Sequence, residues 1–130
     1  DPAVNHAVND FIQLPFIADE NKLIKTDWRP LLDLLQDNEI DPATRAAIFH
    51  SSMAQSIIKQ VELFKDKLQV DAVGLSGGVF QNRVLVEKVF QLADRKNLKI
   101  LLPKEIPVND GGLSYGQIIE FAAYRLAVNK

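Results

Sequence analysis

The chain has 130 residues, of which 47% are hydrophobic and 25% charged, a composition typical of one globular domain. Fifteen Lys and Arg residues against seventeen Asp and Glu residues leave a formal charge of −2, so we expect no nucleic-acid partner, which would favour a basic excess. The chain has no cysteine and no apolar run of the roughly 18 residues that span a membrane, which excludes disulfides and cysteine nucleophiles and favours a cytoplasmic protein outside the membrane.

Residues 1–40 read as an irregular or helical lead-in to this single domain. The chain begins at Asp1 rather than at a methionine, so we expect it to be a piece of a longer polypeptide. Residues 3–14 fit a short helix, and the next stretch, LPFIADENKLIKTDW, predicts a loop or a small hairpin around a polar turn. The stretch TDWRPLLDLLQDN then predicts a short helix, with Thr26 or Asp27 as its N-cap and Pro30 in its first turn.

A long helix is predicted from residue 41 to about residue 68. Asp41 and Pro42 read as the N-cap and the first helical position. Apolar residues then recur at spacings of three and four, which predicts one stripe facing the core over about seven turns. The stripe consists of Phe49, Met53, Ile57, Val61, Phe64 and Leu68.

The remainder of the chain alternates short apolar runs with helical patterns. VDAVGL and LKILLP predict two strands, and between them a helix is expected over residues 79–96 with Val84, Leu85, Val89, Leu92 and Ala93 facing inward. A loop and a last helix over residues 112–126 follow. Helical crossovers between strands indicate a parallel pair, so residues 41–130 are expected to form an α/β core.

Three of the six glycines lie in one stretch of ten residues, VGLSGGVFQN, between the first strand and its helix. In open α/β sheets, ligands bind beyond the carboxyl ends of the strands, where helix N-termini favour phosphates. Ser76, Gly77 and Gly78 would let a phosphate or a ribose approach the backbone without a Cβ in the way. A tight turn without a ligand explains the glycines equally well.

A second glycine-rich corner, PVNDGGLSYGQ, follows the other strand. Asp110 directly precedes two glycines and a helix, so it reads either as an N-cap or as a carboxylate ligand to a cation that bridges phosphates. Neither corner matches a Walker-type loop or the GxGxxG pattern of dinucleotide-binding folds. The first corner also lacks the Asp and Ser of the SGGxDS loop of ATP pyrophosphatases, which leaves that class a distant alternative.

The stretches LSGGVFQNRVLVE and LPKEIPVNDGGLSYGQ closely resemble the C-terminal end of the HypF family of hydrogenase maturation carbamoyltransferases. FHSSMAQSII and DWRPLL resemble two further motifs of that family, so the likeness covers about residues 27–124. The resemblance implies a TsaD-like domain with the two-lobed actin/hexokinase/Hsp70-like (ASKHA) fold. The chain would then be most of the second lobe, and the first lobe and the YrdC-like domain would be missing from it.

The same resemblance implies a chemistry. In that family carbamoyl phosphate and ATP yield carbamoyl adenylate, and the carbamoyl group passes to the C-terminal cysteine of HypE. The group later becomes the cyanide ligands of the [NiFe]-hydrogenase iron. ATP, carbamoyl adenylate and HypE are therefore the expected ligands and partner of the intact protein.

The family's site residues carry over to the two corners. The expected nucleotide-binding residues are Ser76, Gly77, Gly78, Asn82, Gly111 and Gly112. Asp110 would ligate a divalent metal ion, Mg²⁺, iron or zinc, whose other ligands would belong to the missing lobe. No catalytic residue is assigned, and we expect the isolated fragment to be inactive. The alternatives are a non-catalytic module that docks a partner, and a lobe of a TsaD-type enzyme that modifies tRNA.

Overall fold

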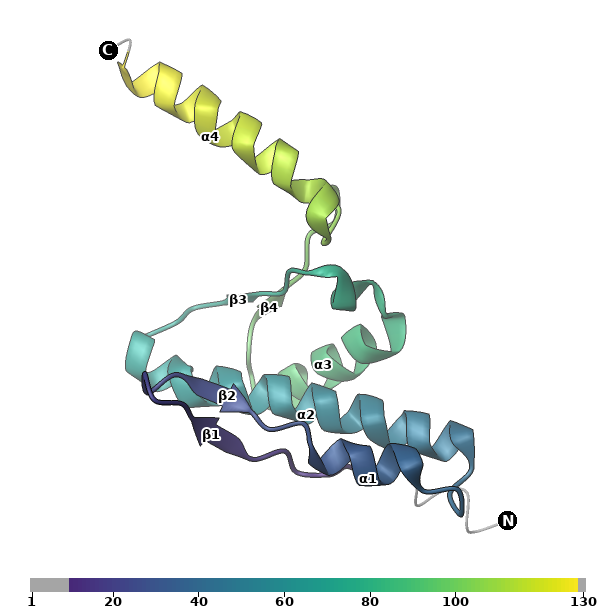
Figure 1. Cartoon of the computed structure of the whole chain (residues 1–130). Coiled ribbons are helices and arrows are strands. Elements are labelled where there is room, and N and C mark those ends of the chain that lie inside the picture. Colours follow the sequence, from purple (N-terminus) through teal and green to yellow (C-terminus); the bar gives the residue numbers. More distant parts are fainter. Residues whose placement is uncertain (1–9, 129–130) are drawn as a thin grey trace.

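The computed structural model describes residues 10–128, and helices and short strands alternate along them (Figure 1). The mixture confirms the predicted α/β class. The elements, in order, are β1 (Phe16–Ala18), β2 (Ile24–Thr26), α1 (Pro30–Gln36), α2 (Pro42–Leu68), β3 (Val73–Gly74), the 3₁₀ turn η1 (Gly78–Gln81), α3 (Arg83–Arg95), β4 (Ile100–Leu101), the 3₁₀ turn η2 (Asp110–Gly112) and α4 (Leu113–Val128). None of the helices in this described part is long and apolar enough to cross a membrane.

Of the two alternatives for the stretch around Asp19, the hairpin is the one that forms. β1 and β2 pair antiparallel, with Phe16 opposite Thr26. The Asp19 carboxylate accepts hydrogen bonds of 2.9 Å from the amides of both Asn21 and Leu23, which closes the turn. An aspartate side chain that satisfies the amide two residues ahead is the usual chemistry of such turns.

Two expectations for the N-terminal region are wrong where the structure describes it. Residues 10–14 are not helical, and the remainder of the predicted helix 3–14 lies outside the described residues. Helix α1 has Arg29 at its N-cap position, not Thr26 or Asp27. The Asp27 carboxylate accepts from the amide and the guanidinium of Arg29 instead, at 2.7 to 3.1 Å, so it precedes the helix as a local ion pair.

The predicted start of the long helix is confirmed. The Asp41 carboxylate accepts hydrogen bonds of 3.0 Å from the amides of Ala43 and Thr44, and Pro42 occupies the first turn. These bonds satisfy two of the amides that have no partner inside the helix. α2 ends where Gln69 adopts a left-handed conformation, with φ of 49°.

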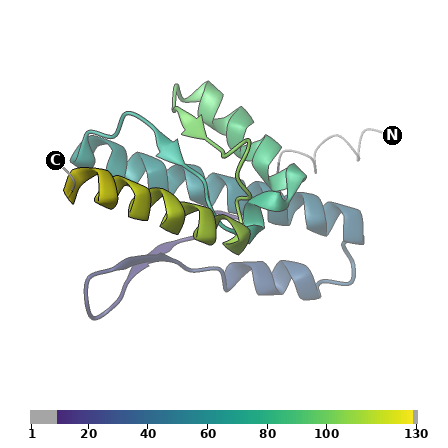
Figure 2. The same cartoon turned by 90° about the horizontal axis from the view of Figure 1, so that it is seen from above.

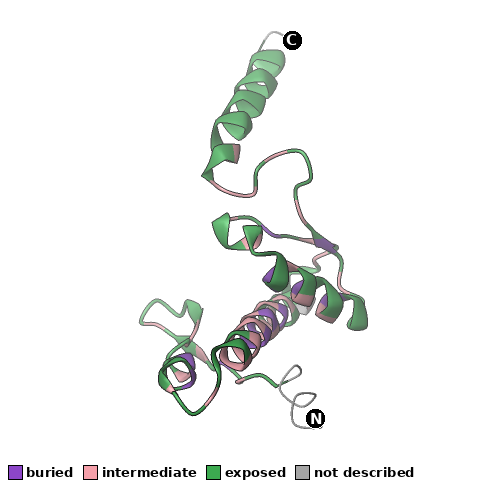
Figure 3. Ribbon diagram, turned by 90° about the vertical axis from the view of Figure 1, so that its right-hand side faces the viewer, coloured by how far each residue is buried: buried purple, intermediate pink, exposed green. Residues whose placement is uncertain are grey.

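Helix α2 lies between two small hydrophobic cores, with the hairpin and α1 on one side and α3 on the other (Figures 2 and 3). Leu14, Leu31 and Leu34 form the buried centre of the core shared with α1. The core shared with α3 and the strands has Ala54, Ile58, Leu75, Leu85, Val89, Ala93 and Ile100 at its buried centre. Met53 packs against both cores, so α2 is the element that joins the two parts of the chain.

The predicted apolar stripe of α2 is only partly right. Phe49, Met53 and Ile57 pack against the cores, but Phe64 and Leu68 near the end of the helix are exposed. The most buried positions of α2 are instead small residues and one isoleucine: Ser51, Ser52, Ala54, Ser56 and Ile58. Small side chains let neighbouring elements approach α2 closely. The spacing of large apolar residues does not indicate these small buried positions.

The two strands that precede the glycine-rich corners lie side by side. β3 pairs in parallel with β4, Val73 opposite Ile100 and Gly74 opposite Leu101. Helix α3 starts at Arg83 rather than at Val79, because η1 intervenes and the Asn82 side chain caps the helix by accepting from the Leu85 amide at 3.1 Å. With this start Leu85, Val89 and Ala93 face the core as predicted, whereas Val84 is exposed.

Helix α4 stands apart from the other helices (Figure 1), and all its described residues are exposed (Figure 3). Its sequence, LSYGQIIEFAAYRLAV, is rich in apolar residues and carries only one acidic and one basic residue. A helix that is apolar on most of its faces is typical of a buried environment.

The Asp41 cap predicts a specific response to acid. Hydrogen bonds from the Thr44 side chain and amide and from the Ala43 amide hold the pKa of Asp41 below its usual value of 3.8. The folded state therefore binds this proton less readily than the unfolded state, so the stabilisation is complete above about pH 4 and is lost as the pH falls through the lowered pKa. Asp41→Asn keeps the cap but removes this titration, and urea unfolding between pH 2 and pH 7 should show a shallower acid decline. Asp41→Ala, which has no cap, should lower stability at every pH, and an unchanged acid slope in Asp41→Asn would contradict the assignment.

Candidate active-site half

The two glycine-rich corners are in direct contact. The Gly77 amide donates a hydrogen bond of 2.6 Å to the Val108 carbonyl, which joins the end of β3 to the loop after β4. A Cβ built on Gly78 would lie 4.0 Å from the Asn109 Cβ, so a side chain at this position would reach the second corner. The structure thus joins the two corners that hold the predicted site residues, because their parallel strands end at the same edge.

Two of the glycines are required by the geometry of this junction. Gly77 has φ of 113°, a conformation that side chains rarely allow. A Cβ on Gly112 would lie 2.7 Å from the Pro107 carbonyl oxygen and 3.2 Å from a methyl carbon of Ile106, which is too close for a real side chain. The tight-turn explanation of the glycines is therefore correct at both corners, whether or not a ligand also approaches them.

The amides of the corners are already engaged. The Gly111 amide donates to the Asn109 side-chain oxygen at 3.0 Å, and the Gly112 amide donates to the Asn109 carbonyl at 2.9 Å. Together with the Gly77 bond, three of the backbone donors expected to face a phosphate bind protein acceptors. Asn109, not Asp110, caps this turn. The N-cap alternative for Asp110 is therefore wrong by one residue.

The groups that remain available are side chains. Ser76 and Asp110 are exposed, and neither side chain hydrogen-bonds any other residue in the described range 10–128. The Asp110 carboxylate has no companion ligands, since the same range contains no cluster of three His, Asp or Glu side chains able to hold a metal ion. One exposed carboxylate does not make a metal site, so this part of the chain fits a metal only as the donor of a single ligand.

Asn82 is held in place by a histidine from α2. Its amide nitrogen lies 2.9 Å from Nε2 of His50, while its side-chain oxygen accepts from the Leu85 amide. A backbone amide only donates, so the Asn82 oxygen must face Leu85 and the nitrogen must face His50. His50 Nδ1 lies 2.7 Å from the Ala46 carbonyl and must carry the ring proton. This contact spans 32 positions of the sequence, and nothing in the motif VGLSGGVFQN indicates it.

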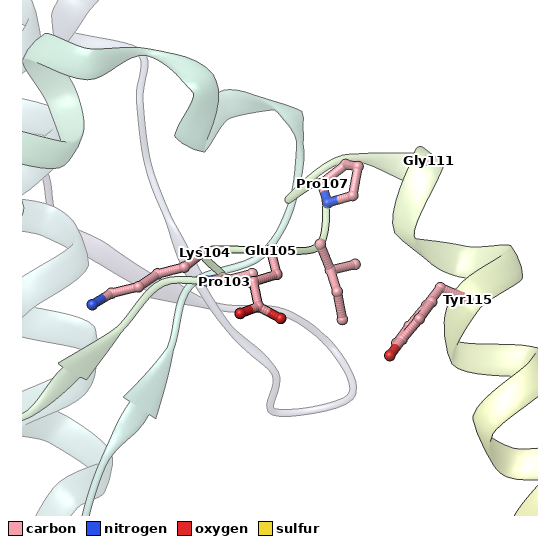
Figure 4. Close-up of a pocket in the computed structure, with 7 residues that line it drawn as sticks. Pro103, Lys104, Glu105, Pro107, Gly111 and Tyr115 are labelled. Atoms are coloured by element: carbon pink, nitrogen blue, oxygen red, sulfur yellow. The ribbon is translucent and has the colours of Figure 1, made fainter.

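A shallow cavity of about 610 Å³ opens beside the second corner (Figure 4). It is lined by Pro103, Lys104, Glu105, Ile106, Pro107, Gly111 and Tyr115. Tyr115 comes from the first turn of α4 and faces the loop after β4 across the cavity (Figure 4). Gly111 is the one predicted site residue in this lining, so the cavity adjoins the junction of the corners rather than enclosing it.

Comparison with known proteins places this fold and these corners in a defined class. Residues 4–117 match the family model described as "Carbamoyltransferase, Kae1-like Domain, second subdomain". This match covers most of the sequence, so the chain belongs to that carbamoyltransferase family.

The similar proteins within the class carry one name. Carbamoyltransferase HypF of Rhodobacter capsulatus is 39% identical over 98 residues, which are 75% of this chain and 13% of that protein. Carbamoyltransferase HypF of Synechocystis is 28% identical over 104 residues, which are 79% of this chain and again 13% of that protein. The resemblance to a C-terminal HypF segment is thereby confirmed. The chain spans only about an eighth of the length of these relatives.

A solved structure shares the fold. The crystal structure of full-length HypF in its phosphate- and nucleotide-bound form superposes with a TM-score of 0.75 and 23% sequence identity, covering 84% of this chain and 15% of that one. At this level of identity the likeness supports the fold alone. It shows that the α/β arrangement described above occurs within a much longer protein.

The junction predicts opposite effects of alanine at two glycines. Gly112→Ala places its Cβ against the Pro107 carbonyl and should destabilise the chain by about 1–3 kcal/mol, the usual cost of overpacking. Gly116 lies in α4 with nothing within 4 Å of a built Cβ, so Gly116→Ala should be neutral or add about 0.5–1 kcal/mol of helix stability. Urea denaturation measures both, and equal effects of the two substitutions would show that the corner is not as tight as described.

The His50 contact predicts one tautomer. Long-range ¹H–¹⁵N spectra of the neutral ring should show a protonated Nδ1 and a bare Nε2 that accepts from Asn82. Asn82→Ala should shift the Nε2 resonance and leave the Nδ1 resonance nearly unchanged. A protonated Nε2 in the unsubstituted chain would exclude the hydrogen bond from Asn82.

Proposed function

We propose that the chain is the nucleotide-binding part of a HypF-type carbamoyltransferase, the second lobe of an actin/hexokinase/Hsp70-like domain. The observation that carries the proposal is the junction of the two corners, where the Gly77 amide donates to the Val108 carbonyl and Gly78 faces Asn109 without a side chain between them. A single glycine-rich turn is common in proteins, but two that meet at one sheet edge provide a surface on which a nucleotide can lie against backbone. The family match and the nucleotide-bound state of the similar HypF structure support the same assignment.

The proposed roles follow from the hydrogen-bonding groups and the open space that each residue still offers to a ligand. Ser76 offers a hydroxyl, and Asn82 retains one amide hydrogen besides the one directed at His50. Gly77, Gly78, Gly111 and Gly112 contribute the absence of side chains, which lets the phosphates and ribose approach the backbone. Since the amides of Gly77, Gly111 and Gly112 are engaged, they position the corners and do not bind the ligand directly.

Asp110 is proposed as one ligand of a divalent metal, Mg²⁺, iron or zinc, with the others supplied by the rest of the longer protein. When bound, such an ion would neutralise phosphate charge on the nucleotide. The contribution of this chain is an exposed carboxylate fixed next to the junction by the Asn109 cap. No further residue of the described part completes the coordination.

The proposed reaction is that of the intact enzyme. Carbamoyl phosphate and ATP would form carbamoyl adenylate, and the carbamoyl group would then pass to the C-terminal cysteine of HypE. This chain would supply binding surface and orientation, with the reacting groups enclosed by the remaining domains. By itself the chain is expected to be inactive, because its cavity is open and its metal site incomplete.

A docking module is the second candidate, and α4 favours it. Leu113, Ile118, Phe121, Tyr124 and Leu126 are each more than 60% exposed along this helix, a degree of apolar exposure that typically marks a surface covered by a partner. A pull-down with HypE and a titration with ATP separate the two candidates. HypE capture without any nucleotide binding in a full-length protein would favour the docking role.

Asp110→Ala tests the proposed metal role in a full-length protein that contains this segment. Loss of one charged ligand should weaken Mg²⁺-dependent ATP binding about ten-fold or more and leave metal-free binding nearly unchanged. Isothermal titration with and without Mg²⁺ measures this difference. Asp71→Ala, which removes an exposed carboxylate in the loop before β3, is the matched control. Equal Mg²⁺ dependence in the unsubstituted protein and in Asp110→Ala would refute the assignment.

A further inference from the structure

A second cavity, of about 320 Å³, is lined by residues outside the glycine corners. It is formed between α2 and α3, and Phe11 from the segment before β1 closes one side of it. Five of its lining side chains are polar: Ser51, Gln55, Lys88, Gln91 and Arg95. Among the described residues that line it there is no carboxylate, so they combine two positive charges with neutral hydrogen-bonding groups.

Ser51 is the unusual residue in this cavity. It is 8% exposed, and its hydroxyl is the buried side-chain polar group without a hydrogen-bond partner in the described part of the chain. The other buried serines of α2 are satisfied, since Ser52 accepts from the Ile12 amide and donates to Ile48, and the Ser56 hydroxyl pairs with that of Thr26. A buried hydroxyl without a partner costs free energy, so it indicates a group that binds at this position.

The two cations of the cavity form no ion pair with any residue that the structure describes. The ion pairs of residues 10–128 involve Lys25, Arg29, Arg83 and Lys96, and neither Lys88 nor Arg95 takes part in one. Lys88 and Arg95 are seven positions apart on α3, so they lie on one face of the helix, with Gln91 between them. Two carboxylates of α3 are neighbours of these cations in the sequence. Glu87, next to Lys88, pairs with Arg83 at 2.6 Å, and Asp94, next to Arg95, does not line the cavity.

We propose that this cavity binds a small oxyanion, specifically phosphate or the phosphoryl group of a larger molecule. An ammonium and a guanidinium would neutralise the charge, and the guanidinium can donate two parallel hydrogen bonds to phosphate oxygens. The Ser51 hydroxyl and the amides of Gln55 and Gln91 supply further donors. A water molecule would satisfy Ser51 as well, but only an anion would also be attracted by the half-buried Lys88 and the exposed Arg95, which is why an anion fits the cavity better.

This cavity is separate from the proposed nucleotide surface. None of its lining residues belongs to the glycine corners or to the cavity beside Tyr115. Asn82 caps the start of α3, and the cavity residues of this helix, from Lys88 to Arg95, lie about 9 to 20 Å farther along it at 1.5 Å per residue. The inference therefore does not depend on the proposed function and can fail independently of it.

The test is a titration of the ¹⁵N-labelled chain with inorganic phosphate, replacing chloride at constant ionic strength. Saturable shifts are expected at Ser51 and at the side-chain amides of Gln55 and Gln91. Lys88→Gln and Arg95→Gln should each weaken binding about ten-fold or more, because each removes a charged hydrogen-bond partner. Lys99→Gln removes an exposed cation outside the cavity and should bind phosphate like the unsubstituted chain.

A second variant separates binding from general stabilisation by salt. Ser51→Ala removes the unpaired hydroxyl, so it should raise the melting temperature of the free chain and reduce the increase that phosphate produces. An unchanged phosphate effect in Ser51→Ala would overturn the proposal. Equal weakening of phosphate binding by Lys99→Gln and Lys88→Gln would also overturn it, because it would indicate non-specific screening. Chemical-shift changes confined to Gly77, Gly78 and Gly111 would overturn it too, because they would place the anion at the corners.

Discussion

The packing of α3 against α2 is the contact on which the rest of the structure depends. Ile58 of α2 and Val89 of α3 are fully buried in the core that also holds Leu75 and Ile100 of the strand segments. This one contact fixes the direction of both strands, and therefore the edge at which their carboxyl ends meet. The two-stranded pair is too small to hold its own position, since isolated pairs of strands are at best marginally stable in water. The helices thus determine where the candidate site lies.

Once the strands are fixed, the corners are held together by backbone rather than by side chains. Gly77, which donates the 2.6 Å bond to Val108, needs glycine because of its φ of 113°. At Gly112 the close approach of Pro107 leaves no room for a side chain. In a phosphate-binding loop such amides would donate to the ligand, whereas here they donate to acceptors within the protein. Because these hydrogen bonds are internal, the position of the junction does not depend on a bound molecule. His50 extends this preorganisation to Asn82, whose amide can take only one orientation.

The sequence predicted those parts of the fold that depend on local chemistry. The Asp41 cap, the hairpin turn at Asp19 and the glycine corners depend on residues within a few positions of one another. Some failures are local, since the caps of α1 and of the turn at Asp110 and the start of α3 are each displaced by a few positions. Other failures depend on contacts between distant segments. The exposure of Phe64 and Leu68 follows from where α3 ends against α2, and the small buried face of Ser52 and Ala54 has no apolar signature. The His50–Asn82 contact and the unpaired Ser51 likewise exist only once α2 and α3 have packed.

The open geometry of the site explains why the proposed activity belongs to the longer protein. Binding sites for small molecules bury most of their ligand's surface, and charges act most strongly where water is excluded. Here Ser76 and Asp110 are exposed to solvent, and the adjoining cavity has one wall formed by the unpartnered helix α4. Covering α4 would bury its apolar residues and also hold Tyr115 against the loop after β4. The same contact would therefore stabilise the helix and cover the candidate site, which would couple folding of this segment to assembly of that site.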